Sequence, residues 1–275
     1  MKFKDKVAVI TGAGGVLCSM FAKALASEGA SVVLLDLNEQ GVADVAEEIK
    51  KEGYIAHYYK CSVLDKVELE GVHNDIINNV GKCDILINGA GGNHPRCTTT
   101  REYYENGDES NDEIKSFFNL DKEDFSFVFD LNLMGTLLPT QVFAKDMLDG
   151  GTIINISSMN AIRPLTKIPA YSSAKSAVSN FTQWLAVHFA NTGIRVNAIA
   201  PGFFVTKQNK DLLFDKDGNP TKRTEKILNA TPMKRFGKPE ELIGTLKWLC
   251  DEKESGFVTG IVVPVDGGFS AYSGV

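Results

Sequence analysis

Residues 7–18 read Val-Ala-Val-Ile-Thr-Gly-Ala-Gly-Gly-Val-Leu-Cys, an apolar run that enters a glycine-rich turn and then a helical pattern. A short apolar run that ends at glycines is typical of a strand buried on both faces, as in a parallel sheet. A second apolar run, Ser31–Asp36, follows the intervening helical pattern. Strand, turn, helix and strand in this order predict a βαβ unit.

The same alternation continues along the chain. We expect seven strands, at Val7–Thr11, Ser31–Asp36, Ile55–Lys60, Asp84–Asn88, Gly151–Ser157, Arg195–Ala200 and Gly260–Val265. Apolar residues at three- and four-residue spacing predict helices at Ser19–Glu28, Glu39–Lys51, Lys66–Asn79, Phe125–Leu148, Ser172–Asn191 and Pro239–Cys250. This pattern predicts an α/β fold, a Rossmann-like doubly wound sheet of seven mostly parallel strands with helices on both faces. Since no repeat or linker divides the chain, we expect one domain over residues 1–275.

Two stretches interrupt the alternation. Residues 92–124 are long for a strand-to-helix connection and read as an insertion, whose part from 102 to 124 holds nine acids and two bases. Residues 203–238 read as a substrate lid, and from 207 onward they hold nine bases and four acids. Such charge runs are most often solvated surface.

Composition excludes several classes of protein. The net charge is -6, from 29 basic and 35 acidic residues, whereas nucleic acids and lipid surfaces attract an excess of Lys and Arg. The five cysteines are scattered and form no metal-binding pattern, which indicates reduced thiols in a cytoplasmic protein and predicts no metal site. The N-terminus has no signal-peptide pattern, and no segment reads as the ~20 apolar residues of a membrane span.

The glycine-rich turn has a chemical use. Glycines between a strand and a helix let the backbone approach a pyrophosphate, and the helix N-terminus offers free N–H groups to it. Asp36 lies 24 residues beyond Gly12, near the spacing expected for a carboxylate that binds a ribose 2′-hydroxyl. Leu37 follows where an Arg would favour a 2′-phosphate. The sequence therefore predicts a dinucleotide site for NAD rather than NADP.

A second group of residues can carry acid–base chemistry. Tyr171 and Lys175 are four residues apart in a predicted helix, so both side chains project from one face. A free phenol has a pKa near ~10, and a neighbouring ammonium together with an oxidised nicotinamide would lower it toward neutrality. Ser158 follows a predicted strand at the carboxyl edge of the sheet, where open α/β folds bind ligands.

Taken together, these motifs resemble the short-chain dehydrogenase/reductase family. Thr11-Gly12, Asn88-Gly89-Ala90-Gly91, Asn132, Ser158, Tyr171, Lys175 and Pro201-Gly202 with Thr206 occur in the family's order and at nearly its spacings. The resemblance implies an oxidoreductase in which Tyr171 is the acid/base, Lys175 lowers its pKa and holds the nicotinamide ribose, Ser158 binds the substrate oxygen and Asn132 holds a relay water. It implies that NAD is bound by Gly12, Gly14, Gly15, Val16, Leu17, Asp36, Leu37, Ser62, Val63, Asn88, Ala90, Gly91, Tyr171, Lys175, Pro201, Gly202, Phe204 and Thr206.

The chain departs from the family pattern at four positions. Val16 and Cys18 stand where the family has glycine, Ser62 where it has an adenine-binding Asp, and Gly89 where Asn is common. These changes affect the geometry of the cofactor turn and leave the acid–base residues in place. A redox role for Cys18 is an alternative to the packing of a small side chain.

Three segments resemble the D-mannonate oxidoreductase branch, which interconverts D-fructuronate and D-mannonate with NAD(H): Ser157–Tyr171, the long insertion after Gly92-Asn93-His94-Pro95, and the ending Phe269–Val275. Gluconate 5-dehydrogenases, as close neighbours, are the alternative, and a non-catalytic NAD-sensing protein is a remote one. A sugar acid requires a cation for its carboxylate. Arg163, His94 and Lys167 are the candidate substrate residues, with Arg96 and the basic segment 207–238 as further candidates, although Arg163 could equally anchor a loop or a subunit interface. The resemblance also implies a homotetramer.

Overall fold

A computed structural model describes residues 1–205 and 213–274. Its centre is a seven-stranded sheet in the order β3-β2-β1-β4-β5-β6-β7, and every neighbouring pair is parallel. The strands are β1 Val7–Thr11, β2 Ser31–Asp36, β3 Ala56–Lys60, β4 Ile85–Asn88, β5 Gly151–Ile156, β6 Ile194–Pro201 and β7 Val262–Val265. The predicted doubly wound α/β fold is confirmed.

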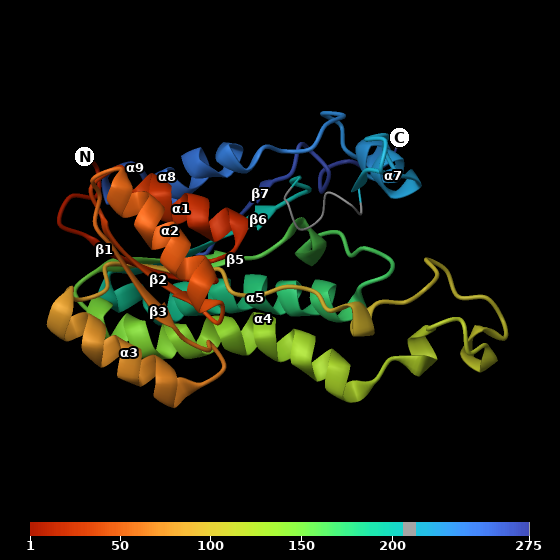
Figure 1. Cartoon of the computed structure of the whole chain (residues 1–275), viewed down its shortest axis with the longest axis horizontal. Helices are drawn as coiled ribbons and strands as arrows, with labels where there is room; N and C mark the ends of the chain where they lie inside the picture. The colour runs from red at the N-terminus through yellow and green to blue at the C-terminus, as the bar shows by residue number, and fades with distance from the viewer. Residues whose placement is uncertain (206–212, 275) are drawn as a thin grey trace.

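Helices cover both faces of this sheet (Figure 1). The α-helices of the described chain are α1 Val16–Ala26, α2 Glu39–Lys51, α3 Lys66–Asn79, α4 Lys122–Phe143, α5 Pro169–His188, α7 Lys222–Ala230, α8 Ile243–Cys250 and α9 Glu252–Ser255. Helices α1, α2 and α8 pack on one face, and α3, α4 and α5 pack on the other. Alternate residues of β1 supply the two cores: Ala8 and Ile10 face α1, while Val7 and Val9 face the opposite layer.

The predicted boundaries hold best where the apolar pattern is cleanest. Two strands, β1 and β2, and two helices, α2 and α3, have the predicted bounds. Helix α5 begins at Pro169 rather than Ser172, because proline has the backbone angle of a first helical turn. The predicted helix Pro239–Cys250 begins as a 3-10 turn before α8, and α7 was missed within the predicted lid.

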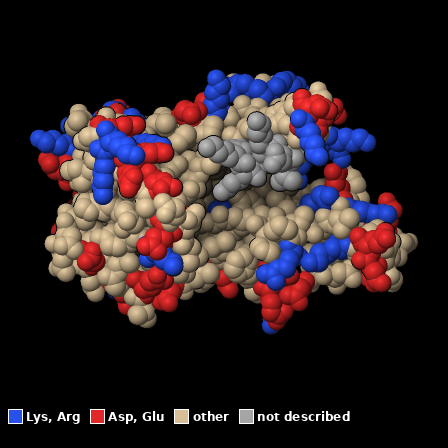
Figure 2. All heavy atoms as spheres, viewed as in Figure 1, with Lys and Arg blue, Asp and Glu red and all other residues tan. Residues whose placement is uncertain are grey.

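The predicted insertion is built of turns and short 3-10 segments and projects at one end of the molecule (Figure 1). Several of its acids have cationic partners. Arg101 pairs with both Glu105 and Asp108, and Lys226 of α7 lies 2.8 Å from Glu102. Figure 2 accordingly shows acidic and basic side chains side by side at this end of the molecule. The insertion and the lid are therefore in direct contact.

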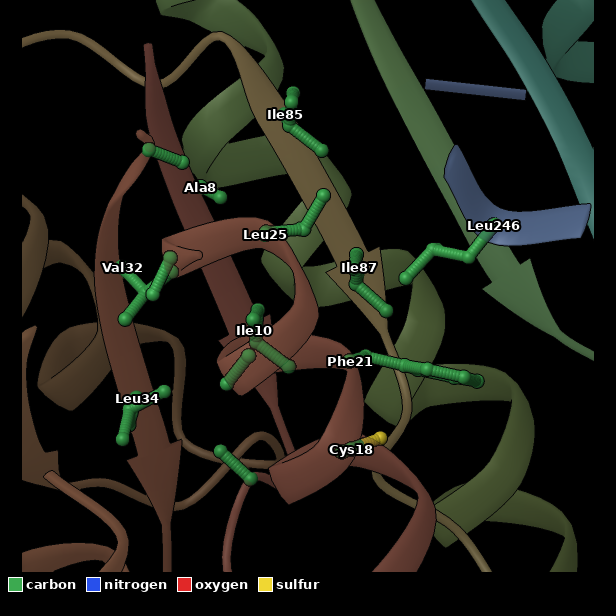
Figure 3. Close-up of a cluster of buried hydrophobic side chains, with 14 of the residues drawn as sticks. Ala8, Ile10, Cys18, Phe21, Leu25, Val32, Leu34, Ile85, Ile87 and Leu246 are labelled. Atoms are coloured by element: carbon green, nitrogen blue, oxygen red, sulfur yellow. The ribbon is translucent and has the colours of Figure 1, made fainter. Parts of the chain in front are cut away.

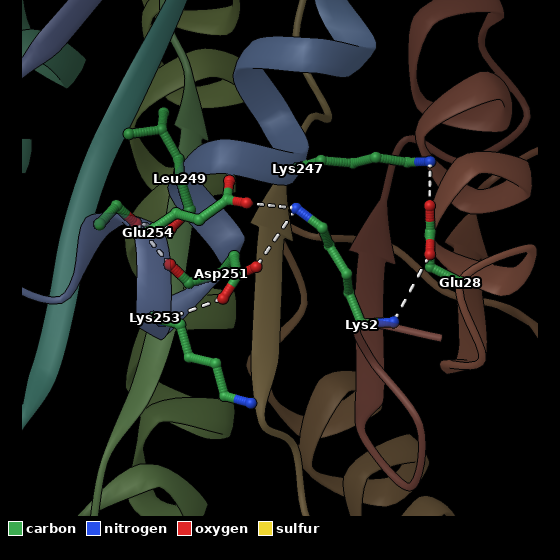
Figure 4. Close-up of polar contacts among 8 residues, drawn as sticks. Lys2, Glu28, Lys247, Leu249, Asp251, Lys253 and Glu254 are labelled. Atoms are coloured by element: carbon green, nitrogen blue, oxygen red, sulfur yellow. Dashed lines mark hydrogen bonds and ion pairs between the residues drawn. The ribbon is translucent and has the colours of Figure 1, made fainter.

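Ion pairs tie the N-terminal segment and the end of α1 to α8 and α9, at the end remote from the cavity described below. Lys2 Nζ lies 2.6 Å from Glu254 and 3.4 Å from Asp251, and Lys247 of α8 bonds Glu28, just beyond α1, at 2.8 Å (Figure 4). These exposed or half-exposed pairs contribute little stability individually. Together they link the N-terminal segment to α8 and α9.

One helical segment of the described chain, 122–147, has the length and mean hydropathy of a membrane span. This differs from the expectation that no segment would read as a membrane span. Half of its most apolar window is buried inside the molecule, and the segment packs beside α5 and α3. Its apolar character therefore serves, at least on that side, the packing of helices on the sheet.

Candidate active site

A cavity of about 770 Å³ lies at the carboxyl ends of the strands. A hollow is visible near the middle of the face shown in Figure 2. The walls of the cavity include sixteen of the residues predicted from sequence: Gly12, Gly14, Gly15, Val16, Leu17, Asp36, Leu37, Val63, Ala90, Gly91, Ser158, Tyr171, Lys175, Pro201, Gly202 and Phe204. The fold thus brings the predicted cofactor and acid–base groups to one site.

The glycine-rich turn forms one wall of the cavity. Gly12 has φ +67°, and a Cβ at this position would lie 2.8 Å from the backbone of Ala90, so only glycine fits. The N–H of Gly14 donates to Asp36 Oδ2 at 3.0 Å, and Gly15 is the N-cap of α1. The turn, the helix N-terminus and the carboxylate are consequently held as one unit, and they fit a dinucleotide.

Two departures from the family pattern are a single packing change. A Cβ added at Gly89 would lie 2.1 Å from Cys18 Sγ, far inside contact distance. Cys18 is buried on α1 and its side chain points toward the β4 side of the turn (Figure 3). The sulfur therefore occupies the space that a larger residue at position 89 would need. Burial raises the pKa of the Cys18 thiol to about 12, so the group is a poor nucleophile at neutral pH.

The acid–base residues lie together on α5 and at the end of β5. Lys175 is buried, its Nζ donates to the carbonyl of Ile156 at 2.7 Å, and it lies 5.7 Å from the Tyr171 ring centroid. Burial lowers the pKa of Lys175 to about 8. Burial also raises the pKa of Tyr171, and the opposing effect comes from a hydrogen bond with Ser158. The protein's own groups thus keep the phenol protonated at neutral pH.

Three predicted residues stand behind the cavity walls. Asn132 of α4 is fully buried and clamps the loop after β4, because its Nδ2 donates to the Gly92 carbonyl at 2.8 Å and its Oδ1 accepts from the Gly92 N–H at 3.2 Å. Asn88 Nδ2 donates to Thr140 and Asn155, which ties β4 to α4 and β5. The Ser62 hydroxyl accepts from the Leu64 N–H. Thr206, the remaining predicted cofactor residue, lies outside the described residues.

The predicted substrate residues do not line this cavity. Arg163 is exposed, and its Nε donates to the carbonyl of Ser270 at 3.1 Å, so it anchors the C-terminal segment. His94 Nδ1 accepts from the Arg96 N–H, and Arg96 pairs with Asp124 at 3.2 Å. Lys167 lines a smaller neighbouring cavity of about 230 Å³. Local backbone and ion-pair partners hold the Arg163, His94 and Arg96 side chains, and spacing along the chain cannot reveal these contacts.

The cavity is also lined by polar residues that were not singled out from the sequence. Asn160 follows Ser158 by two residues, and Arg223 comes from the first turn of α7. Asn160 belongs to the same loop as Arg163 and was passed over for the charged residue. Arg223 is one of the nine bases of the predicted basic segment 207–238, and the structure shows that it lines this cavity from the start of α7.

A parallel sheet with a glycine-rich dinucleotide turn and a tyrosine–lysine pair at its carboxyl edge defines a nicotinamide-dependent oxidoreductase. Sequence comparison agrees: the model of the short chain dehydrogenase family matches residues 6–217. The chain belongs to this family and is a nicotinamide-dependent dehydrogenase.

Three similar proteins bear on its specificity. An uncharacterized oxidoreductase of Haemophilus influenzae is 59% identical over 274 residues, which cover 99% of this chain and 95% of that protein. The uncharacterized oxidoreductase UxuB of Bacillus subtilis is 55% identical, covering 98% of this chain and 96% of that protein. A crystal structure from Haemophilus influenzae with bound NAD, provisionally named a D-mannonate oxidoreductase, is 58% identical with a TM-score of 0.96, covering 100% of this chain and 98% of that chain.

Proposed function

We propose that this enzyme is a cytoplasmic NAD(H)-dependent oxidoreductase that interconverts a keto sugar acid and its hydroxy acid, most specifically D-fructuronate and D-mannonate. The observation that carries the proposal is one cavity lined by Ser158, Tyr171 and Lys175 together with the glycine turn and Asp36. The nicotinamide supplies or accepts the hydride when bound.

Asp36 supports NAD as the cofactor. Its carboxylate ends β2, lines the cavity and is held in place by the Gly14 and Asn38 N–H groups at 3.0 and 2.9 Å. A carboxylate in this position accepts hydrogen bonds from ribose hydroxyls and repels a 2′-phosphate. The neighbouring Leu37 is exposed and offers no cation to that phosphate.

In the reductive direction, the Tyr171 phenol donates a proton to the substrate carbonyl oxygen, and in the oxidative direction the phenolate takes it back. Ser158 hydrogen-bonds the same oxygen and orients it beside Tyr171. Lys175 supplies a positive charge near the phenol and binds the nicotinamide ribose. Asn132 acts from behind by holding the Gly92 loop, and in the family's proton relay it holds a water.

The substrate class is supported by chemistry and by similarity. A sugar acid presents several hydroxyls and one carboxylate, which require polar partners and a cation, and the cavity offers Asn93, Asn160 and Arg223 besides the acid–base residues. The NAD-bound relative from Haemophilus influenzae, at 58% identity, carries the D-mannonate oxidoreductase name.

The test is the oxidation of NADH by the purified enzyme with D-fructuronate and with 5-keto-D-gluconate, side by side, with NADPH as the cofactor control. We expect turnover with D-fructuronate and NADH. Turnover with 5-keto-D-gluconate alone would replace the proposed substrate by gluconate 5-dehydrogenase chemistry. Absence of turnover with a wider panel of ketones would favour a sensing role.

We also propose a homotetramer. Large apolar side chains are exposed on α5 and α4, with Trp184 at 55%, Val187 at 78% and Phe127 at 44% exposure. Burying such a surface between subunits would be favourable. Light scattering coupled to gel filtration measures the mass; a particle near the monomer mass of 30.0 kDa would contradict this assembly.

A further inference from the structure

The active-site cavity adjoins the neighbouring 230 Å³ cavity. Four residues, Leu165, Ile168, Phe203 and Arg223, line both spaces, so the two cavities lie side by side next to the start of α7. The larger cavity alone holds the glycine turn and Tyr171. A substrate that reacts at Tyr171 therefore has room to extend toward α7, and the groups along this path determine what it is.

Asn160 is the first such group. It is only 4% exposed and lines the larger cavity, and its side-chain Oδ1 is buried with no hydrogen-bond partner. No other hydrogen bond in the described chain involves its side-chain amide, while its backbone N–H donates to Ser158 Oγ at 3.2 Å. Buried polar atoms are nearly always paired, so this orphaned oxygen points to a donor on a ligand next to Ser158.

Arg223 is the second group. Its guanidinium has no ion pair or hydrogen bond with the residues that the structure describes, and it lies in the first turn of α7, where the helix N-terminus adds positive potential. The other cations nearby are engaged or displaced. Lys226 pairs with Glu102, Arg163 binds Ser270, and Lys167 lines the smaller cavity but not the larger one. Of these four cations, only Arg223 is both unpaired and present in the larger cavity.

We propose that Asn160 and Arg223 determine substrate specificity by two-point recognition: Asn160 Oδ1 accepts a hydrogen bond from a hydroxyl beside the reacting carbon, and the Arg223 guanidinium binds the terminal carboxylate. A guanidinium matches a carboxylate through two parallel hydrogen bonds, which an ammonium does not provide. The inference rests on the proposed function in placing the reacting carbon at Tyr171. It moves the carboxylate-binding role from Arg163 to a residue 60 positions later in the sequence.

The kinetic test compares D-fructuronate with D-fructose, which has the same number of carbons and no carboxylate. Arg223→Gln is expected to lower kcat/KM for D-fructuronate about 50-fold, mainly through KM, and to change the value for D-fructose less than about twofold. The kcat/KM of Arg223→Lys for D-fructuronate is expected to lie between those of the parent and of Arg223→Gln. Lys222→Gln is the matched control: it removes the same charge from the first turn of the same helix, lines neither cavity, and is expected to cause less than about a threefold change.

Asn160→Ala is expected to lower kcat/KM about tenfold for both sugars, because both present hydroxyls beside the carbonyl. The Kd for NADH, measured by fluorescence, is expected to stay unchanged in all these variants. A raised Kd for NADH in Arg223→Gln would assign the arginine to the cofactor instead and overturn the proposal. Equal losses for D-fructuronate and D-fructose would do the same.

A binding experiment separates this proposal from the proposed function. Calorimetry on the NADH-saturated protein compares D-mannonate with D-mannitol, its uncharged analogue. The parent is expected to prefer the acid, and Arg223→Gln is expected to lose that preference. If the parent prefers the acid and Arg223→Gln does not, but D-fructuronate is not reduced, the carboxylate site is supported and D-fructuronate is rejected as the substrate. If the parent shows no preference for the acid, the carboxylate site itself is refuted.

Discussion

The two ends of the active-site cavity are built differently. At the cofactor end, backbone atoms approach so closely that single atoms decide which residue fits, as where Gly12 meets Ala90 and Gly89 meets Cys18. At the other end, Asn160 and Arg223 extend side chains from a loop and a short helix that are far apart in sequence. Steric fit thus restricts the residue type at the first end. The second end instead presents polar side chains that have no hydrogen-bond or ion-pair partner among the described residues.

This difference explains why the family relationship and the substrate are unequally evident. Close backbone packing restricts residue type, so the cofactor end keeps a pattern of glycines that can be read along the chain. A polar side chain at the open end can come from any segment that reaches it. The lid shows how: the Gly237 N–H donates to the Phe203 carbonyl at 2.9 Å, which brings the two ends of the lid together beside the site.

The largest effect is expected where the two ends meet, at the proton donor. Tyr171→Phe removes the hydroxyl while keeping the ring, and kcat is expected to fall about 10³-fold. The Kd for NADH is expected to change little, because the ring still packs beside Lys175. Stopped-flow or steady-state NADH oxidation measures the rate, and activity within about tenfold of the parent would remove Tyr171 from the acid–base role.

A larger side chain at position 89 is expected to disrupt the close packing at the cofactor end. Gly89→Ala places a methyl group against Cys18 Sγ and is expected to weaken NADH binding about 100-fold or to destabilise the fold by about 1–3 kcal/mol. Adding Cys18→Gly removes the sulfur and should restore most of the loss. Titration of NADH fluorescence and thermal unfolding measure both quantities. A double variant no better than Gly89→Ala would show that the two positions are not coupled.

The charge at the cofactor end can be changed to test its preference for NADH over NADPH. Asp36→Ala combined with Leu37→Arg removes the carboxylate and adds a cation where a 2′-phosphate would lie. The ratio of kcat/KM for NADPH over NADH is expected to rise by about 100-fold, with NADH losing about tenfold. Asp36→Ala alone serves as the control, since it removes repulsion without adding attraction. An unchanged cofactor preference would contradict the role of Asp36.

A smaller effect is expected from pH. The pKa of Lys175 is lowered to about 8 by burial, so the side chain is charged below pH 8 and loses its charge above it, while the raised pKa of Tyr171 keeps the phenol protonated over the same range. We expect kcat/KM for ketone reduction to be level below pH 8 and to fall by about tenfold per pH unit above it. A profile that is level to pH 10 would contradict this.

The smallest effect is expected from thiol reagents. The five cysteines are free and buried, and burial raises the pKa of Cys18 and Cys250 to about 12. Iodoacetamide at pH 8 is therefore expected to cost less than about twofold in activity. Rapid inactivation that NADH prevents would revive the redox role of Cys18.

Much of the scaffold follows from local pattern. The apolar runs at Val7–Thr11 and Ser31–Asp36 and the helical periods at Glu39–Lys51 and Lys66–Asn79 predict elements with the observed bounds. Each of these strands and helices buries apolar residues in the core, so apolar residues recur at regular spacing along its whole length. Helix α7 lies on the surface over the site, so its short amphipathic pattern carries little signal beyond the capping Thr221.

The residues of the candidate site likewise fall into two groups, those that local motifs predict and those that they do not. The Tyr171 and Lys175 spacing, the Gly12 turn and Asp36 are local motifs, and the fold brings them to one cavity as expected. Arg163, His94 and Lys167 do not line this cavity. Charge along a chain does not show which contacts form in the fold: Arg96 pairs with Asp124, and Arg163 bonds Ser270.

By itself, therefore, the sequence determined the α/β fold, the dinucleotide turn and the acid–base residues, because each depends on residues close together in the chain. The tertiary structure decided that Arg223 lines the active-site cavity whereas Arg163 and Lys167 do not, and that the departures at Cys18 and Gly89 are one change. Those outcomes depend on contacts between segments far apart in sequence, whose packing and pairing exist only in the folded molecule.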